Sequence, residues 1–101
     1  MKTIRMSYVR EIYNQMNPEG HWFDKATMRF FKTVLPETAV ETDQGLYFIT
    51  RETGPSEIPM YSIRMLDTDT GHIETVYEFN SYKTKKAAMS DLKKLLTPDQ
   101  Q

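Results

Sequence analysis

The amino-acid sequence predicts an α+β fold in which a four-stranded antiparallel meander sheet carries two N-terminal helices and a C-terminal helix on one face. Apolar residues recur at helical spacing near both ends of the chain, whereas the middle alternates apolar and polar residues and is rich in aromatic and β-branched types. Turn sequences separate the middle segments by few residues, so consecutive strands should pair antiparallel. The length of 101 residues fits a single domain, residues 1–101, of which 97–101 are expected to form a flexible tail.

The first expected helix covers residues 7–16. Its apolar residues are spaced i, i+3, i+4 and i+7, which places them on one stripe; they are Val9, Ile12, Tyr13 and Met16. The turn sequence Asn17-Pro-Glu-Gly20 follows and should end this helix.

The aromatic segment 20–31 holds the only Trp, three of the five Phe and one of the two His. Asp24 is a good N-cap, and Phe23 and Met28 occupy the two positions of a hydrophobic staple. A short helix is therefore expected over residues 25–32, and Pro36 prevents it from continuing. The residues of this segment that we expect to be buried are Phe23, Met28 and at least one of Phe30 and Phe31.

Four strands are expected over residues 38–42, 46–51, 60–66 and 72–79. The turns Asp43-Gln-Gly45 and Asp67-Thr-Asp-Thr-Gly71 separate two pairs of them, with Gly71 in a left-handed conformation, and residues 52–59 form a loop that should be mobile. Alternation along the last strand should turn one set of side chains towards the core: Ile73, Thr75, Tyr77 and Phe79. The other set, expected to face water, is His72, Glu74, Val76 and Glu78.

The last expected helix covers residues 85–96, with Thr84 as its N-cap. Its apolar face consists of Ala88, Met89, Leu92, Leu95 and Leu96. Lys93 and Lys94 lie in the final turn, where the helix dipole favours cations.

The sequence contains no recognisable catalytic, metal-ligating or cofactor-binding set, so we expect a protein that is not an enzyme, with no metal and no cofactor. The absence of Cys excludes thiolate catalysis and Cys-based zinc sites. His21 can contact Asp24 across a turn, but the second His, His72, is distant in sequence. Asp67, Asp69 and Glu78 match three positions of a calcium-binding EF-hand loop, yet Gly71 and His72 stand where a ligand and the required Gly belong.

Charge is unevenly distributed along the chain although the net charge is only −1. Residues 1–36 carry a net +3, residues 37–79 a net −7 and residues 80–101 a net +3. Mutual attraction between helices and sheet explains this without a partner; a polarised surface that steers association is the functional alternative. Candidate partner-binding residues are Glu74, Glu78, Lys85, Lys86, Lys93 and Lys94.

Two signatures resemble a group of small proteins of unassigned activity encoded by bacteriophages and other mobile elements. The first is Gly20-His-Trp-Phe-Asp24 with Thr27-Met-Arg-Phe-Phe31; the second is the hairpin 61–73 with Glu78-Phe79 and the Lys/Ala-rich helix after it. The likeness covers residues 18–96 and departs in the N-terminal helix. It implies a bacterial host that carries a phage or plasmid.

Small phage proteins without catalytic residues usually act by binding. We therefore expect a non-enzymatic interaction protein, of the type of a counter-defence inhibitor such as an anti-CRISPR protein, that binds a host or phage protein in a nucleic-acid-processing complex. The alternative is an accessory protein that binds nucleic acid directly through the basic C-terminal helix. No signal peptide or apolar segment of the ~20 residues needed to span a membrane is present, so a location in the bacterial cytoplasm and no membrane partner are expected.

Overall fold

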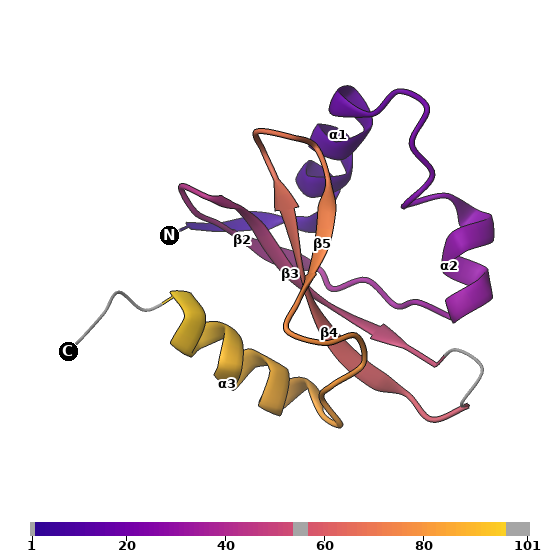
Figure 1. Cartoon of the computed structure of the whole chain (residues 1–101), viewed down its shortest axis with the longest axis vertical. Helices are drawn as coiled ribbons and strands as arrows, with labels where there is room; N and C mark the ends of the chain where they lie inside the picture. The colour runs from indigo at the N-terminus through magenta and orange to yellow at the C-terminus, as the bar shows by residue number, and fades with distance from the viewer. Residues whose placement is uncertain (1, 54–56, 97–101) are drawn as a thin grey trace.

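A five-stranded antiparallel sheet in the order β1-β2-β3-β4-β5 forms the centre of the protein (Figure 1). This computed structural model describes residues 2–53 and 57–96, so the expected tail 97–101 and residues 54–56 of the expected loop lie outside it. The elements are β1 (Lys2–Arg5), α1 (Met6–Met16), α2 (Lys25–Phe31), β2 (Thr38–Glu41), β3 (Gly45–Glu52), β4 (Met60–Asp67), β5 (Ile73–Val76) and α3 (Lys85–Leu96). The α+β class and the antiparallel meander are confirmed.

The expectation of four strands is wrong, because the chain begins with a further strand, β1. This strand pairs antiparallel with β2, with Thr3 opposite Val40. It has only four residues and runs directly into α1 without a side-chain cap at Arg5. The first N–H of the helix, on Met6, instead donates to the carbonyl of Glu37 at 2.9 Å, so the strand pairing also positions the helix.

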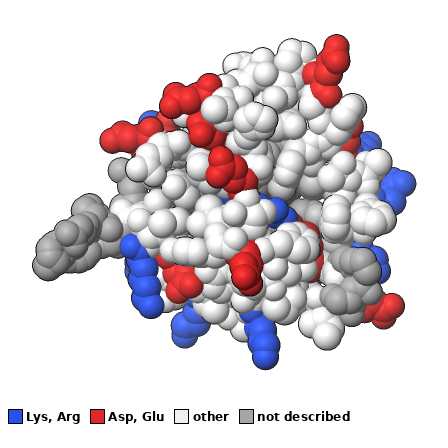
Figure 2. Space-filling view, in the orientation of Figure 1, with Lys and Arg blue, Asp and Glu red and all other residues white. Residues whose placement is uncertain are grey.

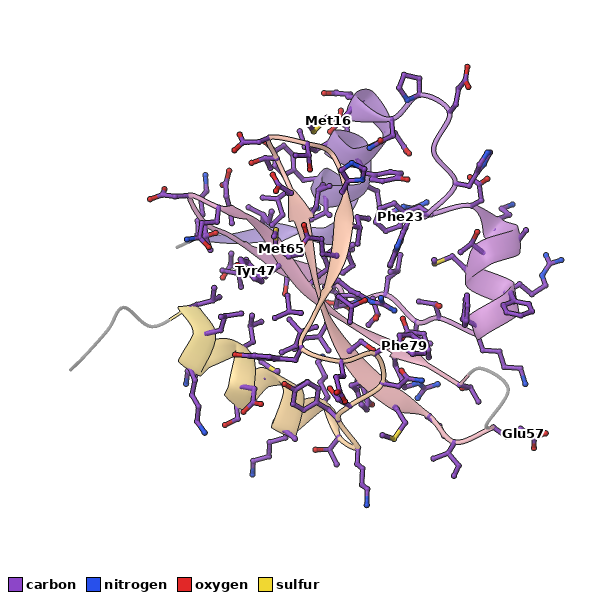
Figure 3. The ribbon with its side chains drawn as sticks, in the orientation of Figure 1. Met16, Phe23, Tyr47, Glu57, Met65 and Phe79 are labelled. Atoms are coloured by element: carbon purple, nitrogen blue, oxygen red, sulfur yellow. The ribbon has the colours of Figure 1, made fainter. Side chains whose placement is uncertain are left out.

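The helices cover both faces of the sheet, not one. Alternate residues of a strand point to opposite faces, and in β3 Phe48 packs with Val9 of α1 while Ile49 packs with Leu92 of α3. Figure 3 shows Phe23 on the side of α1 and α2, and Tyr47 on the side of α3. Two small cores therefore form, one on each face, and the sheet lies between them.

The last strand ends three residues earlier than expected. β5 stops at Val76, because Tyr77 adopts a left-handed backbone with φ 65° that no strand can continue. Tyr77 and Phe79, expected in the core, are instead 60% and 47% exposed. Val76, expected in water, packs against the α3 core.

The aromatic helix α2 buries none of its residues. Phe23, which precedes it, is buried as expected, but Met28 and Phe31 are only half-buried and Phe30 is 69% exposed. Asp24 occupies the N-cap position without a side-chain cap bond. Of the two expected staple residues, only Phe23, in the loop before α2, is buried, and α2 itself lies at the surface.

Local signals at several turns and caps are confirmed. The backbone N–H of Ala87 donates to Thr84 Oγ1 at 3.1 Å, so Thr84 caps α3. Gly71 has φ 82°, the left-handed conformation expected of it. On α3, Ala88 and Leu92 are buried, whereas Met89 is 52% exposed and lies at the edge of the expected apolar face.

Candidate functional site

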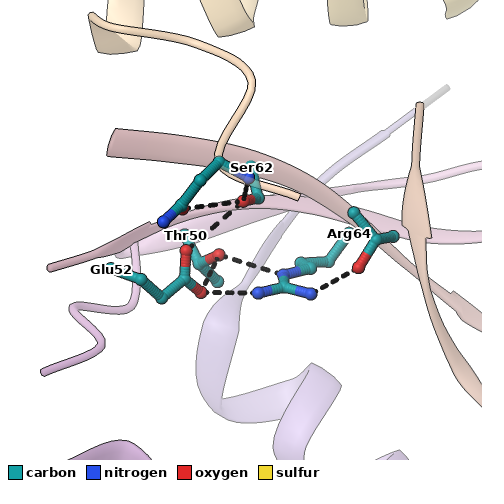
Figure 4. A network of polar contacts seen from close by, with 6 residues as sticks. Thr50, Glu52, Ser62 and Arg64 are labelled. Carbon is teal, nitrogen blue, oxygen red and sulfur yellow. Dashed lines mark hydrogen bonds and ion pairs between the residues drawn. The ribbon is translucent and has the colours of Figure 1, made fainter. Parts of the chain in front are cut away.

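A buried ion pair joins β3 and β4 at the centre of a polar network (Figure 4). Arg64 Nη2 donates to Glu52 Oε2 at 2.7 Å, and the two side chains are 10% and 1% exposed. Thr50 Oγ1 donates to the same carboxylate oxygen at 2.6 Å and accepts from Arg64 Nε at 3.1 Å. The third guanidinium nitrogen of Arg64, Nη1, donates to Thr75 Oγ1 of β5. The charges are thus paired and hydrogen-bonded, as buried charges must be.

Strand alternation explains why these polar groups meet. Thr50 and Glu52 continue the face of β3 that carries Phe48, and Ser62 and Arg64 lie on the same face of β4. Antiparallel register places Thr50 opposite Ser62. The α1 face of the sheet is therefore apolar at one end and polar at the other.

The guanidinium of Arg64 also lies between two aromatic rings. Its central carbon is 5.3 Å from the ring centroid of Trp22 and 5.1 Å from that of Phe79. Arginine can stack on aromatic faces while its N–H groups bond in the guanidinium plane. The buried network is thereby connected to rings that reach the surface.

Together with two rings of α2, these rings form what we call the aromatic surface. Its members are Trp22, Phe30, Phe31 and Phe79. Phe31 makes edge contacts with Phe30 at 4.7 Å and with Phe79 at 6.1 Å between centroids. Phe30 is 69% and Phe79 47% exposed, while Trp22 and Phe31 are half-buried. Clustered exposed aromatic rings on an otherwise polar protein are typical of interaction sites.

The polar network also fixes the turn that presents Phe79. The backbone N–H of Asn80 donates to Ser62 Oγ at 2.7 Å, and Ser62 Oγ lies 3.3 Å from Asn80 Oδ1. Asn80 has φ 53° and Tyr77 φ 65°, conformations that cost a non-glycine residue ~1–3 kcal/mol each. Such strain persists where the surroundings impose it, and here it turns Phe79 away from the strand and onto Arg64.

On the opposite face, Tyr82 connects β4 to α3. Its main chain pairs with Tyr61, and its hydroxyl donates to Asp91 Oδ2 at 2.8 Å. Burial, followed by the hydrogen bond to Asp91, raises the pKa of Tyr82 to about 12. Burial, followed by the charge of Glu74, also raises the pKa of Tyr47.

The predicted partner-binding residues do not form one site. Glu74 lies exposed on β5, whereas Glu78 lies beyond the end of that strand, so alternation no longer places the two on one face. The exposed lysines of α3, which are Lys85, Lys86, Lys93 and Lys94, spread over about half of its circumference at ~100° per residue. Their role in binding stays a prediction.

Like charges form local clusters in space, although carboxylates also occur elsewhere on this face (Figure 2). Carboxylates gather over the β2–β3 and β4–β5 turns at the upper left, while Lys and Arg project at the lower edge over α3 and at the right over α2. The two basic regions therefore lie on different sides of the molecule.

The residues considered for metal binding are engaged otherwise. His21 Nδ1 and Asp24 Oδ2 are 2.6 Å apart at the exposed start of α2. Asp67 Oδ1 accepts the backbone N–H groups of Asp69 and Thr70, which makes a turn. Within residues 2–53 and 57–96, no three His, Cys, Asp or Glu side chains come together as a metal site requires. The same described part of the chain contains no helix with the length and apolarity of a membrane span.

Comparison with known families covers almost the whole fold. The model of a family of unknown function, DUF7447, matches residues 5–93. The chain belongs to this family. No curated protein and no solved structure shows significant similarity to the chain. The matched range includes the polar network and the whole aromatic surface, so both lie within the domain that defines DUF7447.

The polar network was not foreseen from the sequence, although a signal for it exists. Glu52 was assigned to a loop, yet it continues the alternation of Phe48 and Thr50 at the end of β3. A carboxylate and a guanidinium at same-face positions of two strands joined by a short connection are candidates for a cross-strand pair. Of the pair, Arg64 also lies over the rings of Trp22 and Phe79.

Proposed function

We propose that this DUF7447 protein is a non-catalytic binding protein that docks onto another protein through its aromatic surface. The observation that carries the proposal is that α2 buries no residue yet presents Phe30, 69% exposed, in contact with Phe31 and through it with Phe79. A seven-residue helix is not stable by itself, so its position is imposed by its surroundings. A rigid exposed aromatic group loses little conformational entropy on binding.

The buried Arg64 supports this role by orienting the rings. Interface hot spots are enriched in Trp, Tyr and Arg and are surrounded by groups that exclude water. Arg64 stacks on both Trp22 and Phe79 and is fixed by Glu52. A partner would therefore meet a preorganised surface, which lowers the entropic cost of association.

The resemblance to phage-encoded proteins supplies the proposed partner class. We propose that the partner is a protein of a host nucleic-acid-processing complex in the bacterial cytoplasm, and that docking inhibits that complex in the manner of an anti-CRISPR protein. Direct nucleic-acid binding by the lysines of α3 remains the second prediction, and no structural feature favours it over docking.

A pull-down from nuclease-treated bacterial lysate, followed by reconstitution with the purified partner, tests the proposal. Phe30→Ala is expected to weaken binding by at least about 1.4 kcal/mol, tenfold, if Phe30 is a hot spot. Met89→Ala is the matched control, because Met89 is 52% exposed on the opposite face of the sheet. Equal binding by the wild type and Phe30→Ala, or capture that disappears with nuclease treatment, would contradict docking through the aromatic surface.

A further inference from the structure

An open groove of about 670 Å³ lies between α1, α2 and the end of β3, next to the aromatic surface. Its cationic lining residues, which we call the basic groove residues, are Arg10, Lys25, Arg29, Lys32 and Arg51. No Asp or Glu is among the lining residues. All five cations are exposed, and within the described part of the chain none forms an ion pair.

Helical geometry places two of these cations side by side. Lys25 and Arg29 are spaced i and i+4 on α2, so their side chains lie on one face, about 5–6 Å apart at Cβ. Lys32 follows the helix as its C-cap, in a left-handed conformation with φ 50°. Arg10 approaches from α1, with its guanidinium carbon 6.0 Å from the ring centroid of Phe23. Arg51 of β3 also contributes to the lining, although strand alternation places it on the same face as Ile49. The positive charges around the groove attract an anionic ligand.

The groove floor is apolar, which distinguishes it from an ordinary solvated basic helix face. Phe23, Met28, Val34 and Leu35 contribute to the lining, and Val34 is 50% exposed. A ligand that fits must therefore combine repeated negative charge with flat or apolar groups. A single nucleic-acid strand has this combination, because it has one phosphate per nucleotide and bases that stack on apolar and aromatic surfaces.

An acidic peptide fits less well because the strand main chain at Val34 and Arg51 that lines the groove is already paired. Extended peptides in grooves gain affinity from hydrogen bonds to a free strand edge. Here Val34 N–H donates to Arg51 O at 2.8 Å and Arg51 N–H donates to Val34 O at 3.1 Å. These main-chain groups already satisfy each other, so recognition falls to the side chains alone.

We propose that the basic groove binds a single strand of nucleic acid, with its cations on the phosphates and its apolar floor under the bases. This goes beyond protein docking by the aromatic surface, and it assigns nucleic-acid contact to α1 and α2 rather than to α3. The two surfaces lie on different faces of α2: Lys25 and Arg29 line the groove, while Phe31 contacts Phe79.

Fluorescence anisotropy with a labelled oligothymidylate at a series of salt concentrations tests the proposal. The wild type is expected to bind at low salt, and the double variant Arg29→Gln, Lys32→Gln is expected to bind about tenfold more weakly or worse. For single strands each phosphate contact contributes about −0.7 to the slope of log K against log salt, so this variant should flatten the slope by about 1.4. Thermal melts should coincide, since both side chains are exposed.

The matched control is Lys85→Gln, Lys86→Gln, which removes the same charge from α3. We expect it to leave affinity and salt slope unchanged. No binding by the wild type, or equal losses in both double variants, would overturn the groove as the site. Equally tight binding of poly-glutamate, abolished by the groove variant, would show a polyanion-binding protein surface and overturn the nucleic-acid assignment. Phe30→Ala should leave oligothymidylate binding intact, so the groove proposal and the docking proposal can be refuted independently of each other.

Discussion

Arg64 is the residue through which the sheet interior is connected to the aromatic surface. Its Nε bonds Thr50, a further nitrogen bonds Thr75, a third pairs with Glu52, and its faces meet two rings. Only a planar guanidinium offers donors around its edge and two stacking faces at once. Lysine would keep the charge and lose this geometry.

Arg64→Met should destabilise the fold by ~3–5 kcal/mol, because it leaves the Glu52 carboxylate buried without a cation. Urea unfolding measures this loss. The double variant Glu52→Leu, Arg64→Met should recover most of it, since an apolar pair leaves no orphaned charge. As a control, Arg51→Met replaces an exposed arginine, so its unfolding free energy should stay within ~0.5 kcal/mol of the wild-type value. A loss below ~1 kcal/mol in the single variant would mean that the pair is hydrated and not structural.

Tyr82 makes stability depend on alkaline pH. Its pKa is raised from 10.0 to about 12 in the fold, so the neutral phenol is favoured when the protein is folded. The corresponding stabilisation is complete below pH 10 and is lost as the pH rises through about 12. The melting temperature of the wild type should therefore fall more steeply between pH 10 and 12 than that of Tyr82→Phe. Parallel curves for the two proteins would show that neither burial nor the bond to Asp91 raises the pKa of Tyr82 in solution.

At the scale of elements, α2 and α3 show how similar local signals lead to different packing. Both helices begin after a good capping residue, but Thr84 caps α3 with its hydroxyl, whereas the carboxylate of Asp24 turns back to His21. The twelve residues of α3 bury Ala88 and Leu92, while the seven of α2 bury none. A short helix has too little length to cover a sheet face and remains a surface feature.

Truncations in the aromatic segment should separate core from surface. Phe23→Ala is expected to cost ~3–5 kcal/mol, because Phe23 is buried against Tyr13, Trp22 and Phe48. Phe30→Ala should change the unfolding free energy by no more than ~0.5 kcal/mol, as befits a ring that is 69% exposed. Chemical denaturation of both variants decides the matter. Comparable losses would show that Phe30 packs in the fold and cannot serve as a free anchor.

Element positions were largely predictable from the sequence because they depend on local chemistry. The start of α3 follows from the cap at Thr84 and the β4–β5 turn from Gly71, whereas α2 begins after Asp24 as expected but without a side-chain cap bond. β1 was missed because three of its four residues are exposed and no turn separates it from α1. Its existence depends on pairing with β2, a contact more than thirty residues away along the chain.

Which helix covers which face of the sheet, and which residues form the candidate site, were less predictable because both depend on tertiary contacts. Alternation separates Phe48 from Ile49 but does not say which helix covers which side. The left-handed backbone of Tyr77 and the burial of Glu52 arise from the turn 77–80 and from the rings above Arg64. Periodicity assigned Phe79 to the core, because it cannot anticipate the left-handed backbone of Tyr77. Glu52 was assigned to a loop because Gly and Pro residues follow it, although it continues the alternation of β3.

At the scale of the whole molecule, the sheet separates two basic regions and carries an acidic end (Figure 2). The cations of the groove lie with α1 and α2, the lysines of α3 lie on the other face, and the carboxylates lie over the β2–β3 and β4–β5 turns. Opposed poles orient a protein as it approaches a charged partner and so affect the association rate more than the final affinity.

Charge reversal at two exposed carboxylates, Glu74 on β5 and Glu78 beyond its end, tests whether surface charge steers docking. If the protein partner is basic, as the surface of a nucleic-acid channel is, Glu74→Lys with Glu78→Lys should slow association about tenfold at low salt. Folding should be retained, because both side chains are exposed. The effect should diminish as salt rises, since the Debye length is only about 8 Å at physiological ionic strength.

The opposite reversal on α3 makes the prediction directional. Lys85→Glu with Lys86→Glu should accelerate association with a basic partner, while dissociation, which depends on the aromatic contacts, changes little in either variant. Surface plasmon resonance across a salt series gives both rates. If both variants slow association, or if only dissociation changes, these residues contact the partner directly instead of steering it. Glu74 and Glu78 would then belong to the interface itself.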